Sequence, residues 1–304
     1  VLQGAAMGAA VMCARAILRD LYAPTAGARV MSQAFSGLGV IACLCAPIGA
    51  ALTVWIHWRA AVLAMGVCGA AALALVAGRF HETLAPEQRQ PLRAGVLLAG
   101  WQHILAHPTF WAFSTLTMAT YGGLLTFLAA SPFVFTQLLG LSKTAFGLLM
   151  LLNSLAYIGG TFLCRYWLAR FGVRRSVARA AGLSLAGGVS MAILSLQGWV
   201  SVWSIMLPQL LYMVGHGIHQ SCGQSGSVGP FPQTAGAASA LNGFLMMLCA
   251  FGMGAWLGRH MDGTALPMTL GVGFWSLMIA LSAWTLVQRH GEPAPRSDRI
   301  ASGA

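Results

Sequence analysis

The sequence predicts an all-helical protein whose helices cross a membrane, and three observations support this prediction. Hydrophobic residues make up 58% of the 304 residues, charged residues only 8%, and the mean hydropathy is +0.74. Soluble domains carry about 25% charged residues, so a chain this poor in charge lacks the polar surface that water requires. Glycine occurs 37 times, mostly inside the apolar runs, and helices in lipid tolerate glycine well.

Nine stretches of the sequence have the length and composition of membrane-spanning helices. A span needs about 20 mostly apolar residues to cross the hydrocarbon core of a bilayer. The predicted spans are residues 1–18, 30–55, 60–76, 110–135, 144–168, 178–196, 202–221, 237–257 and 266–287.

A polar segment divides these spans into a group of three and a group of six. It holds two of the six acidic residues and three prolines, and its last part, 94–107, is amphipathic. That pattern is typical of a linker that ends in a helix lying on the membrane surface. We therefore expect three spans in residues 1–80, a linker at 81–108, a six-span bundle at 109–289 and a tail at 290–304.

Basic residues are distributed unequally between the two ends of the predicted spans. Following the chain through the spans puts the arginines of 15–29, 79–93, 165–179 and 289–299 at one end, and only Arg59, Lys143 and Arg259 at the other. Because loops rich in Lys and Arg stay in the cytoplasm, we expect the linker and the C-terminus to be cytoplasmic. The net charge of +11 then reflects membrane topology, and we expect no nucleic acid as a partner.

The cysteines and histidines do not predict a metal site, a cofactor or an enzyme. The seven cysteines form no CxxC pair and lie in or at the end of apolar runs, so we expect small buried side chains. His103 and His107 have the four-residue spacing of a helix face, but no carboxylate within five residues completes a ligand set. No nucleophile–base pair or phosphate-binding loop is recognisable.

Two histidines, His216 and His219, lie inside a predicted span. Their spacing puts both on one helix face, and Gln220 and Gln224 extend the polar strip. An ionisable group at membrane depth is a functional hypothesis by default, and histidine titrates near neutral pH. Two interpretations stay open: a proton or substrate pathway, or neutral histidines hydrogen-bonded between helices. Other spans hold single polar residues that either line such a pathway or bridge helices, namely Tyr121, Asn153 and Asn242.

The first 22 residues contain Gln-Gly, then small residues, then Arg-Asp-x-Tyr, at Gln3, Gly4, Arg19, Asp20 and Tyr22. This pattern resembles the fourth helix of the major facilitator superfamily, in its bicyclomycin-resistance branch of drug:proton antiporters. The string ACLCAPIGAAL resembles the antiporter motif of the fifth helix, with Pro47 in register and alanines in place of the glycines. The strings ASPFVF and GPFPQTAGAASALNGF also match, so the similarity covers nearly the whole chain.

A second motif of that superfamily, the loop sequence D-R-x-G-R-R, is matched by Arg170, Gly172, Arg174 and Arg175, with Ala169 at the aspartate position. For these arginines we expect mainly anchoring at the cytoplasmic surface. For Arg19 and Asp20 the resemblance implies a gating role, in which the charges pair differently in the inward- and outward-facing states. A snorkelling anchor is the alternative interpretation.

The resemblance implies a twelve-span transporter fold of which this sequence holds about nine spans. It further implies a monomer in the inner membrane of a bacterium that exports drugs or similar small molecules in exchange for protons, by rocking of two helix bundles. We expect the 304 residues alone to transport poorly, since three helices of one bundle would be lacking. The alternatives are a carrier for a different metabolite and a non-transporting membrane remnant or interaction partner.

Overall fold

The computed structural model describes residues 2–21, 24–80, 94–231 and 234–291, and every regular element in these ranges is a helix. The all-helical prediction is therefore confirmed. Six helical stretches are long and apolar enough to cross a membrane, namely Gly37–Trp55, Trp58–Arg79, Pro108–Leu138, Lys143–Leu196, Ala235–His260 and Leu266–His290. The count of nine spans stays a prediction.

Two predicted spans form helices that are not among these six. The first, α1 (Leu2–Leu21), has a shorter apolar stretch, Leu2–Val11, within the part that the structure describes. The other, α7 (Val202–Val228), carries glutamines and histidines whose polarity lowers its hydropathy, at Gln209, His216, His219, Gln220 and Gln224. These polar side chains explain why α7, although long enough, is not among the six apolar stretches.

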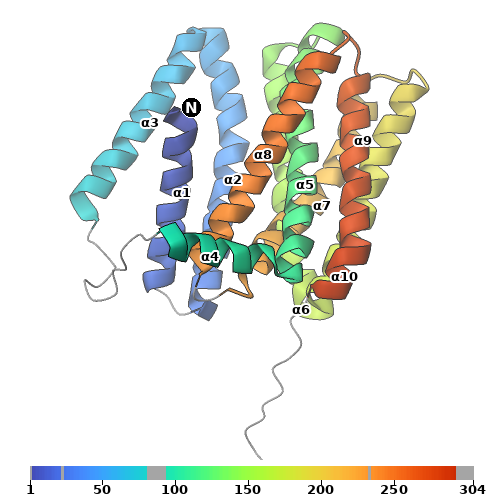
Figure 1. The fold of residues 1–304 in the computed structure, drawn as a ribbon. Helices are drawn as coiled ribbons and strands as arrows, with labels where there is room; N and C mark the ends of the chain where they lie inside the picture. The colour runs from blue at the N-terminus through green and yellow to red at the C-terminus, as the bar shows by residue number, and fades with distance from the viewer. Residues whose placement is uncertain (1, 22–23, 81–93, 232–233, 292–304) are drawn as a thin grey trace, which may run out of the picture.

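Each of the first three helices runs antiparallel to the one before it (Figure 1). After α1, helix α2 (Pro24–Trp55) returns along the molecule and α3 (Trp58–Arg79) reverses again. Between α2 and α3 the His57 imidazole accepts a hydrogen bond from the Arg59 backbone N–H at 3.3 Å. Helix α2 packs on the later helices at Gly39, which faces Ile158. Helix α3, in contrast, contains no buried residue.

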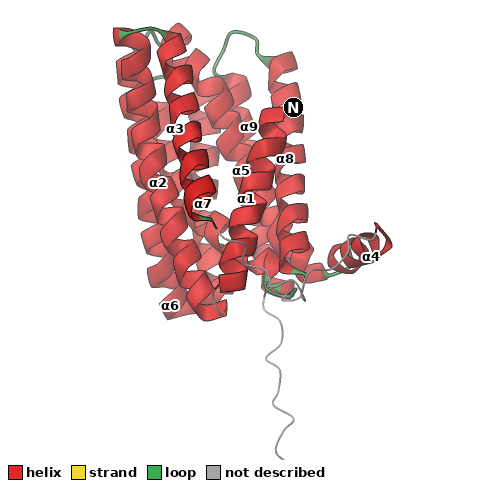
Figure 2. Ribbon diagram, turned by 90° about the vertical axis from the view of Figure 1, so that its left-hand side faces the viewer, coloured by secondary structure: helices red, strands yellow, loops and turns green. Residues whose placement is uncertain are grey.

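Helix α4 (Ala94–Leu105) lies beside one end of the bundle and runs roughly at right angles to the long helices (Figures 1 and 2). It is tied to the following helix by the Trp111 indole N–H, which donates to the Leu105 carbonyl at 2.7 Å. The sequence predicted a helix over 94–107, and a helix is present there. Its place on a membrane surface stays a prediction.

Helix α5 (Pro108–Pro132) continues into the π-helical turn η2 (Phe133–Leu138). The 54 residues of α6 (Lys143–Leu196) follow. As one straight helix they would reach about 80 Å, far more than the roughly 30 Å of a hydrocarbon core. At Gly172 the backbone has φ 71° and ψ 178°, a conformation that glycine adopts without a steric penalty, and α6 reverses into two antiparallel halves (Figure 1).

Helices α7, α8 (Ala235–His260) and α9 (Leu266–Leu281) complete a bundle with α5 and α6, followed by the short helices η3 (Ser282–Leu286) and α10 (Val287–His290). Its core includes the fully buried Leu116, Phe127 and Met206. The α6 and α7 backbones are in contact at Gly160, where a Cβ would collide with the Val214 carbonyl. Such close approach at small residues is how helices associate in lipid, where apolar contact alone offers little gain.

Most of the described arginine and lysine residues lie at one end of the molecule. Arg79 ends α3, Arg289 lies in α10, and Arg165 to Arg179 flank the turn of α6, all at the end where α4 lies (Figure 1). The opposite end has Arg59, Lys143 and Arg259. The predicted separation of charge along the bundle is therefore present, while the side of the membrane that each end faces stays a prediction.

Candidate functional site

The site begins with the polar face of α7. The helix starts with a capping box, in which the Ser201 hydroxyl accepts from the Ser204 N–H and the Ser204 hydroxyl accepts from the Ser201 N–H. Fifteen residues further along, His216 is only 3% exposed and His219 is 0% exposed. Both predicted histidines are thus inside the bundle, between α5 and the two halves of α6.

His216 joins three helices. Its Nδ1 lies 2.9 Å from the Thr120 hydroxyl on α5, and its ring centroid lies 5.7 Å from that of Tyr157 on α6. The Thr120 hydroxyl is able to donate to a neutral imidazole or to accept from a protonated one. His216 therefore has a hydrogen-bond partner in either protonation state.

His219 is held differently. Its Nε2 lies 3.3 Å from the carbonyl oxygen of Val177 in the second half of α6, and because a carbonyl only accepts, Nε2 carries the proton. Its Nδ1 is buried and has no hydrogen-bond partner among the described residues. A second proton there would bury a charged N–H without an acceptor, which is costly in an apolar interior. The geometry favours a neutral His219 that ties α7 to α6.

Helix α5 provides the polar contacts around the histidines. The Tyr212 hydroxyl donates to the Thr120 carbonyl at 2.9 Å, so Thr120 binds α7 through both its side chain and its backbone. One turn earlier, the Thr117 hydroxyl donates to Asn242 Oδ1 on α8 at 2.9 Å. The structure thus brings His216 and Asn242 to neighbouring turns of α5.

The other predicted polar residues are not joined to this network by any described contact. Asn153 is 4% exposed, and its Oδ1 has no partner among the described residues. Gln220 is half-buried, and within the described ranges its Oε1 has no hydrogen-bond partner. Gln224 is half-buried and makes a contact of its own, and Tyr121 is half-buried on α5. Their roles as pathway residues stay predictions.

The predicted motif residues lie far from the histidines in the chain and fall into two groups. On α1, Gln3 and Gly4 are exposed, and Pro47 is half-buried inside α2. Tyr22 and the side chains of Arg19 and Asp20 lie outside the described residues. The second group, Arg170, Gly172, Arg174 and Arg175, forms the turn of α6. No described contact tests the gating expected of Arg19 and Asp20, and the surface anchoring expected of the arginines in the second group also stays a prediction.

Sequence reasoning missed the residues that hold the histidines. Thr117 and Thr120 are three apart on one face of α5, which was a usable signal, whereas Tyr212 and Tyr157 look like ordinary apolar span residues. It also missed a close pair of thiols, since Cys164 on α6 and Cys222 on α7 are both buried with Sγ atoms 3.8 Å apart. Pairings between helices of this kind depend on the rotation of each helix, which the sequence pattern leaves undetermined.

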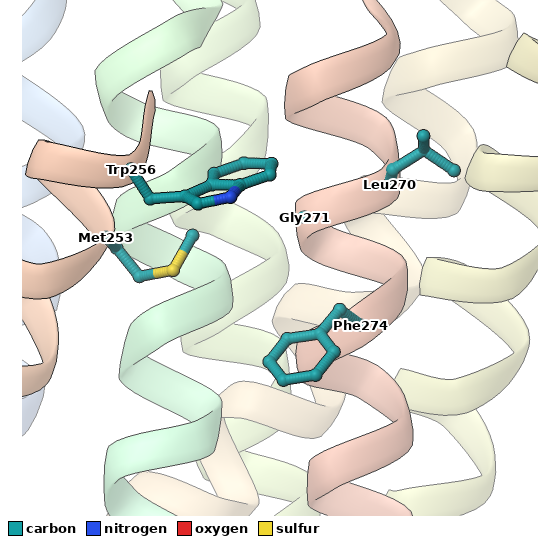
Figure 3. Close-up of a pocket in the computed structure, with 5 residues that line it drawn as sticks. All are labelled: Met253, Trp256, Leu270, Gly271 and Phe274. Carbon is teal, nitrogen blue, oxygen red and sulfur yellow. The ribbon is translucent and has the colours of Figure 1, made fainter. Parts of the chain in front are cut away.

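Two apolar hollows flank α8 near the end of the molecule opposite to α4. The larger, with a volume of about 410 Å³, lies between α8 and α9 and is lined by Met253, Trp256, Leu270, Gly271 and Phe274 (Figure 3). The second, of about 320 Å³, is lined by Leu125, Leu128, Ala129, Ala250, Met253, Gly254 and Leu257. Neither contains a predicted site residue. Their linings suit hydrocarbon groups, with no charged side chain to orient a polar ligand.

Comparison with known proteins agrees with this architecture. The family model described as Major Facilitator Superfamily matches residues 1–254. A "Bicyclomycin resistance protein homolog" of Haemophilus influenzae is 24% identical over 95% of this chain and 72% of its own length. An "Uncharacterized MFS-type transporter YdgK" of Bacillus subtilis is 28% identical over 88% and 66%. "Multidrug resistance protein MdtL" of Escherichia coli is 26% identical over 92% and 67%.

The chain thus spans about two thirds of the length of these relatives. The predicted resemblance is confirmed, and with it the prediction of a polytopic membrane protein that is a transporter and not an enzyme. All three relatives are bacterial and match at low identity over most of this chain. The match to the family model covers more than four fifths of the sequence and includes α1 to most of α8. This chain belongs to the Major Facilitator Superfamily.

Proposed function

We propose that this protein exports drugs or similar small amphipathic molecules in exchange for protons. Two of the relatives carry names of drug-resistance proteins, which supports the substrate class. The observation that supports proton coupling is His216, an ionisable side chain buried where α5, α6 and α7 meet. Buried ionisable groups in membrane helices commonly belong to ion pathways.

In this proposal His216 carries the proton and His219 has a structural role. When neutral, His216 accepts at Nδ1 from the Thr120 hydroxyl; when protonated, it donates to Thr120, whose hydroxyl proton must then find another acceptor. Protonation thus reverses a hydrogen bond between α5 and α7. A contact that differs between two protonation states is able to bias alternating access, in which two bundles rock about a site near the midplane.

The proposal also includes the membrane in which the protein lies and its orientation in that membrane. The protein acts as a monomer in the bacterial inner membrane, with α4 and the C-terminus in the cytoplasm. The gathering of arginines at the α4 end of the bundle supports this orientation, because positively charged loops stay inside. Cysteine labelling from either side of intact cells tests it. Labelling of a cysteine at residue 300 by an impermeant external reagent would overturn it.

The test of function uses a bacterial strain without its own exporters, and the protein is expressed with any sequence that its gene encodes before Val1. Energy-dependent efflux of a fluorescent lipophilic cation is followed as a function of pH. We expect His216→Ala to flatten the pH profile. We expect His219→Ala to lower the amount of protein in the membrane while the remaining protein keeps its pH profile.

His103→Ala is the matched control, because it removes a histidine that is exposed on α4 and lies outside the bundle interior. Its ring has an edge-on neighbour, Phe231, with the ring centroids 6.0 Å apart. It should leave both the pH profile and the protein level unchanged. An unchanged pH profile in His216→Ala, at normal protein level, would mean that His216 is structural. Absence of efflux by the unmodified protein would contradict the proposed transport of this substrate class.

A further inference from the structure

The turn of α6 carries five arginines within fifteen residues, at Arg165, Arg170, Arg174, Arg175 and Arg179. We call this segment, residues 165–179, the arginine turn. It lies at the same end of the molecule as α4 and α10 (Figure 1). Topology explains why arginines are found at this end, but does not explain how so many like charges are accommodated in one turn.

Two of these arginines share one aromatic ring. The Arg179 guanidinium carbon lies 3.5 Å from the centroid of the Phe171 ring, and that of Arg170 lies 5.6 Å from the same centroid. The two charges are therefore within about 9 Å of each other, inside a Debye length of roughly 10 Å. Cation–π attraction holds each charge on the ring, but the charges repel each other.

The surroundings of the turn add no described counter-charge. The last helices pack on it through Gln288 Nε2, which donates to the Arg174 carbonyl at 3.1 Å, and the Trp284 indole, which donates to the Ala178 carbonyl at 3.0 Å. Arg174 Nε is buried without a hydrogen-bond partner among the described residues. Asp262 is the one acidic residue with a described side chain, and it lies at the opposite end of the bundle.

Apolar surface adjoins the arginines on the same helix face. Phe162, Tyr166 and Arg170 follow at four-residue intervals, which places them in one row along α6. Phe162 is 61% exposed and Tyr166 is 58% exposed. Arg170 donates to the Tyr166 hydroxyl at 3.0 Å, and the Arg165 guanidinium lies over the Phe162 ring at 4.4 Å. A row that changes from exposed aromatic rings to guanidinium groups matches a molecule with an apolar chain and an anionic head.

We propose that the arginine turn binds the headgroup of an anionic phospholipid, with the acyl chains along Phe162 and Tyr166. Guanidinium groups recognise phosphate by paired N–H donors, and basic pockets at the ends of membrane helices suit anionic headgroups. The phosphate lies between Arg170 and Arg179, where both guanidinium groups are able to donate to it. A lipid is favoured over a free anion because the apolar row continues from the arginines toward the middle of the bundle.

The experiment measures lipid binding to the purified protein in a neutral detergent. Binding is followed by native mass spectrometry and by the quenching of the protein's tryptophan fluorescence by a labelled lipid. Phosphatidylglycerol and phosphatidylcholine are compared. We expect phosphatidylglycerol to bind more tightly, and Arg170→Gln with Arg179→Gln to weaken its binding about thirtyfold. Added salt should weaken binding to the unmodified protein and have less effect on the double variant.

The matched control is Arg59→Gln with Arg259→Gln, which removes the same charge from the opposite end of the bundle. Arg170→Lys with Arg179→Lys keeps the charge, so it should fold normally and bind more weakly than arginine, because lysine lacks the paired donors. Equal binding of phosphatidylcholine, or equal loss in the control pair, would overturn the proposal. Displacement of the lipid by inorganic phosphate at a similar concentration would overturn it in favour of a soluble anion.

Discussion

Of helices α3 and α5, the more apolar one is the less buried. The α3 span has the highest mean hydropathy of the six long apolar helices, 2.3, and none of it is buried, whereas the span that includes α5 has the lowest, 1.4, and 56% of it is buried. In water the order would be reversed. In lipid the surroundings are as apolar as leucine, so hydrophobic side chains gain little by leaving the bilayer for a helix interface.

The two helices differ in the polar contacts that they make. Helix α5 binds α7 through Thr120 and α8 through Thr117. Helix α3 has small residues, but nothing lies within 4 Å of where a Cβ would stand at Gly66, Gly69 or Gly78. Small residues thus permit close packing of membrane helices, and hydrogen bonds between particular side chains add to the packing of α5.

The largest effect is expected where two backbones touch. Gly160→Leu places a side chain where the Val214 carbonyl already lies, so α6 and α7 must separate and the protein should lose about 3 kcal/mol or more of stability. Thermal unfolding in detergent and the yield of folded protein measure this loss. Gly66→Leu in α3 is the matched control and should change neither. A comparable loss from Gly66→Leu would mean that α3 is packed as closely as α6.

The sequence predicted the helices better than their contacts. The reversal at Gly172 was predictable, because arginines interrupt the apolar run between residues 168 and 178. The shared face of His216 and His219 was predictable from their spacing. Their different partners, Thr120 and the Val177 carbonyl, were not, because a hydrogen bond between helices depends on how each helix is rotated. Similarly, no pattern places Cys164 beside Cys222, or Arg170 and Arg179 on one phenyl ring.

A smaller effect is expected from the bond between α5 and α8. Thr117→Val removes the donor to Asn242 Oδ1, and Asn242→Leu removes the acceptor. Each single variant should lose stability, and a double-mutant cycle should give a coupling near 0.6 kcal/mol, the average for such bonds in membrane proteins. Unfolding in detergent measures all four proteins. Cys68→Ala, an exposed change in α3, should have no effect, and a coupling of zero would contradict the described bond.

The smallest effect is expected in two exposed loops, one between α8 and α9 and one between α2 and α3. In both loops a side chain accepts a hydrogen bond from a backbone N–H two residues later. Between α8 and α9, Asp262 Oδ1 accepts from the Thr264 hydroxyl at 2.6 Å and from the Thr264 N–H at 3.0 Å. The side-chain bond, followed by the backbone bond, lowers the pKa of the Asp262 carboxyl below its usual value. Between α2 and α3, His57 accepts a single backbone bond from Arg59. Both loops are exposed to solvent, so each cap contributes little.

Asp262→Asn should therefore lower the melting temperature only slightly at neutral pH. A carboxyl whose pKa is lowered by folding stabilises the folded state above its unfolded pKa of about 3.9 and loses that contribution as the pH falls through the lowered value. The difference between the two proteins should thus be constant from about pH 7 to pH 5 and should shrink as the pH falls below about 4. His57→Ala should give a small loss at neutral pH. A difference for Asp262→Asn that grows as the pH falls would mean that the charge of Asp262 destabilises the loop, against the hydrogen bonds described.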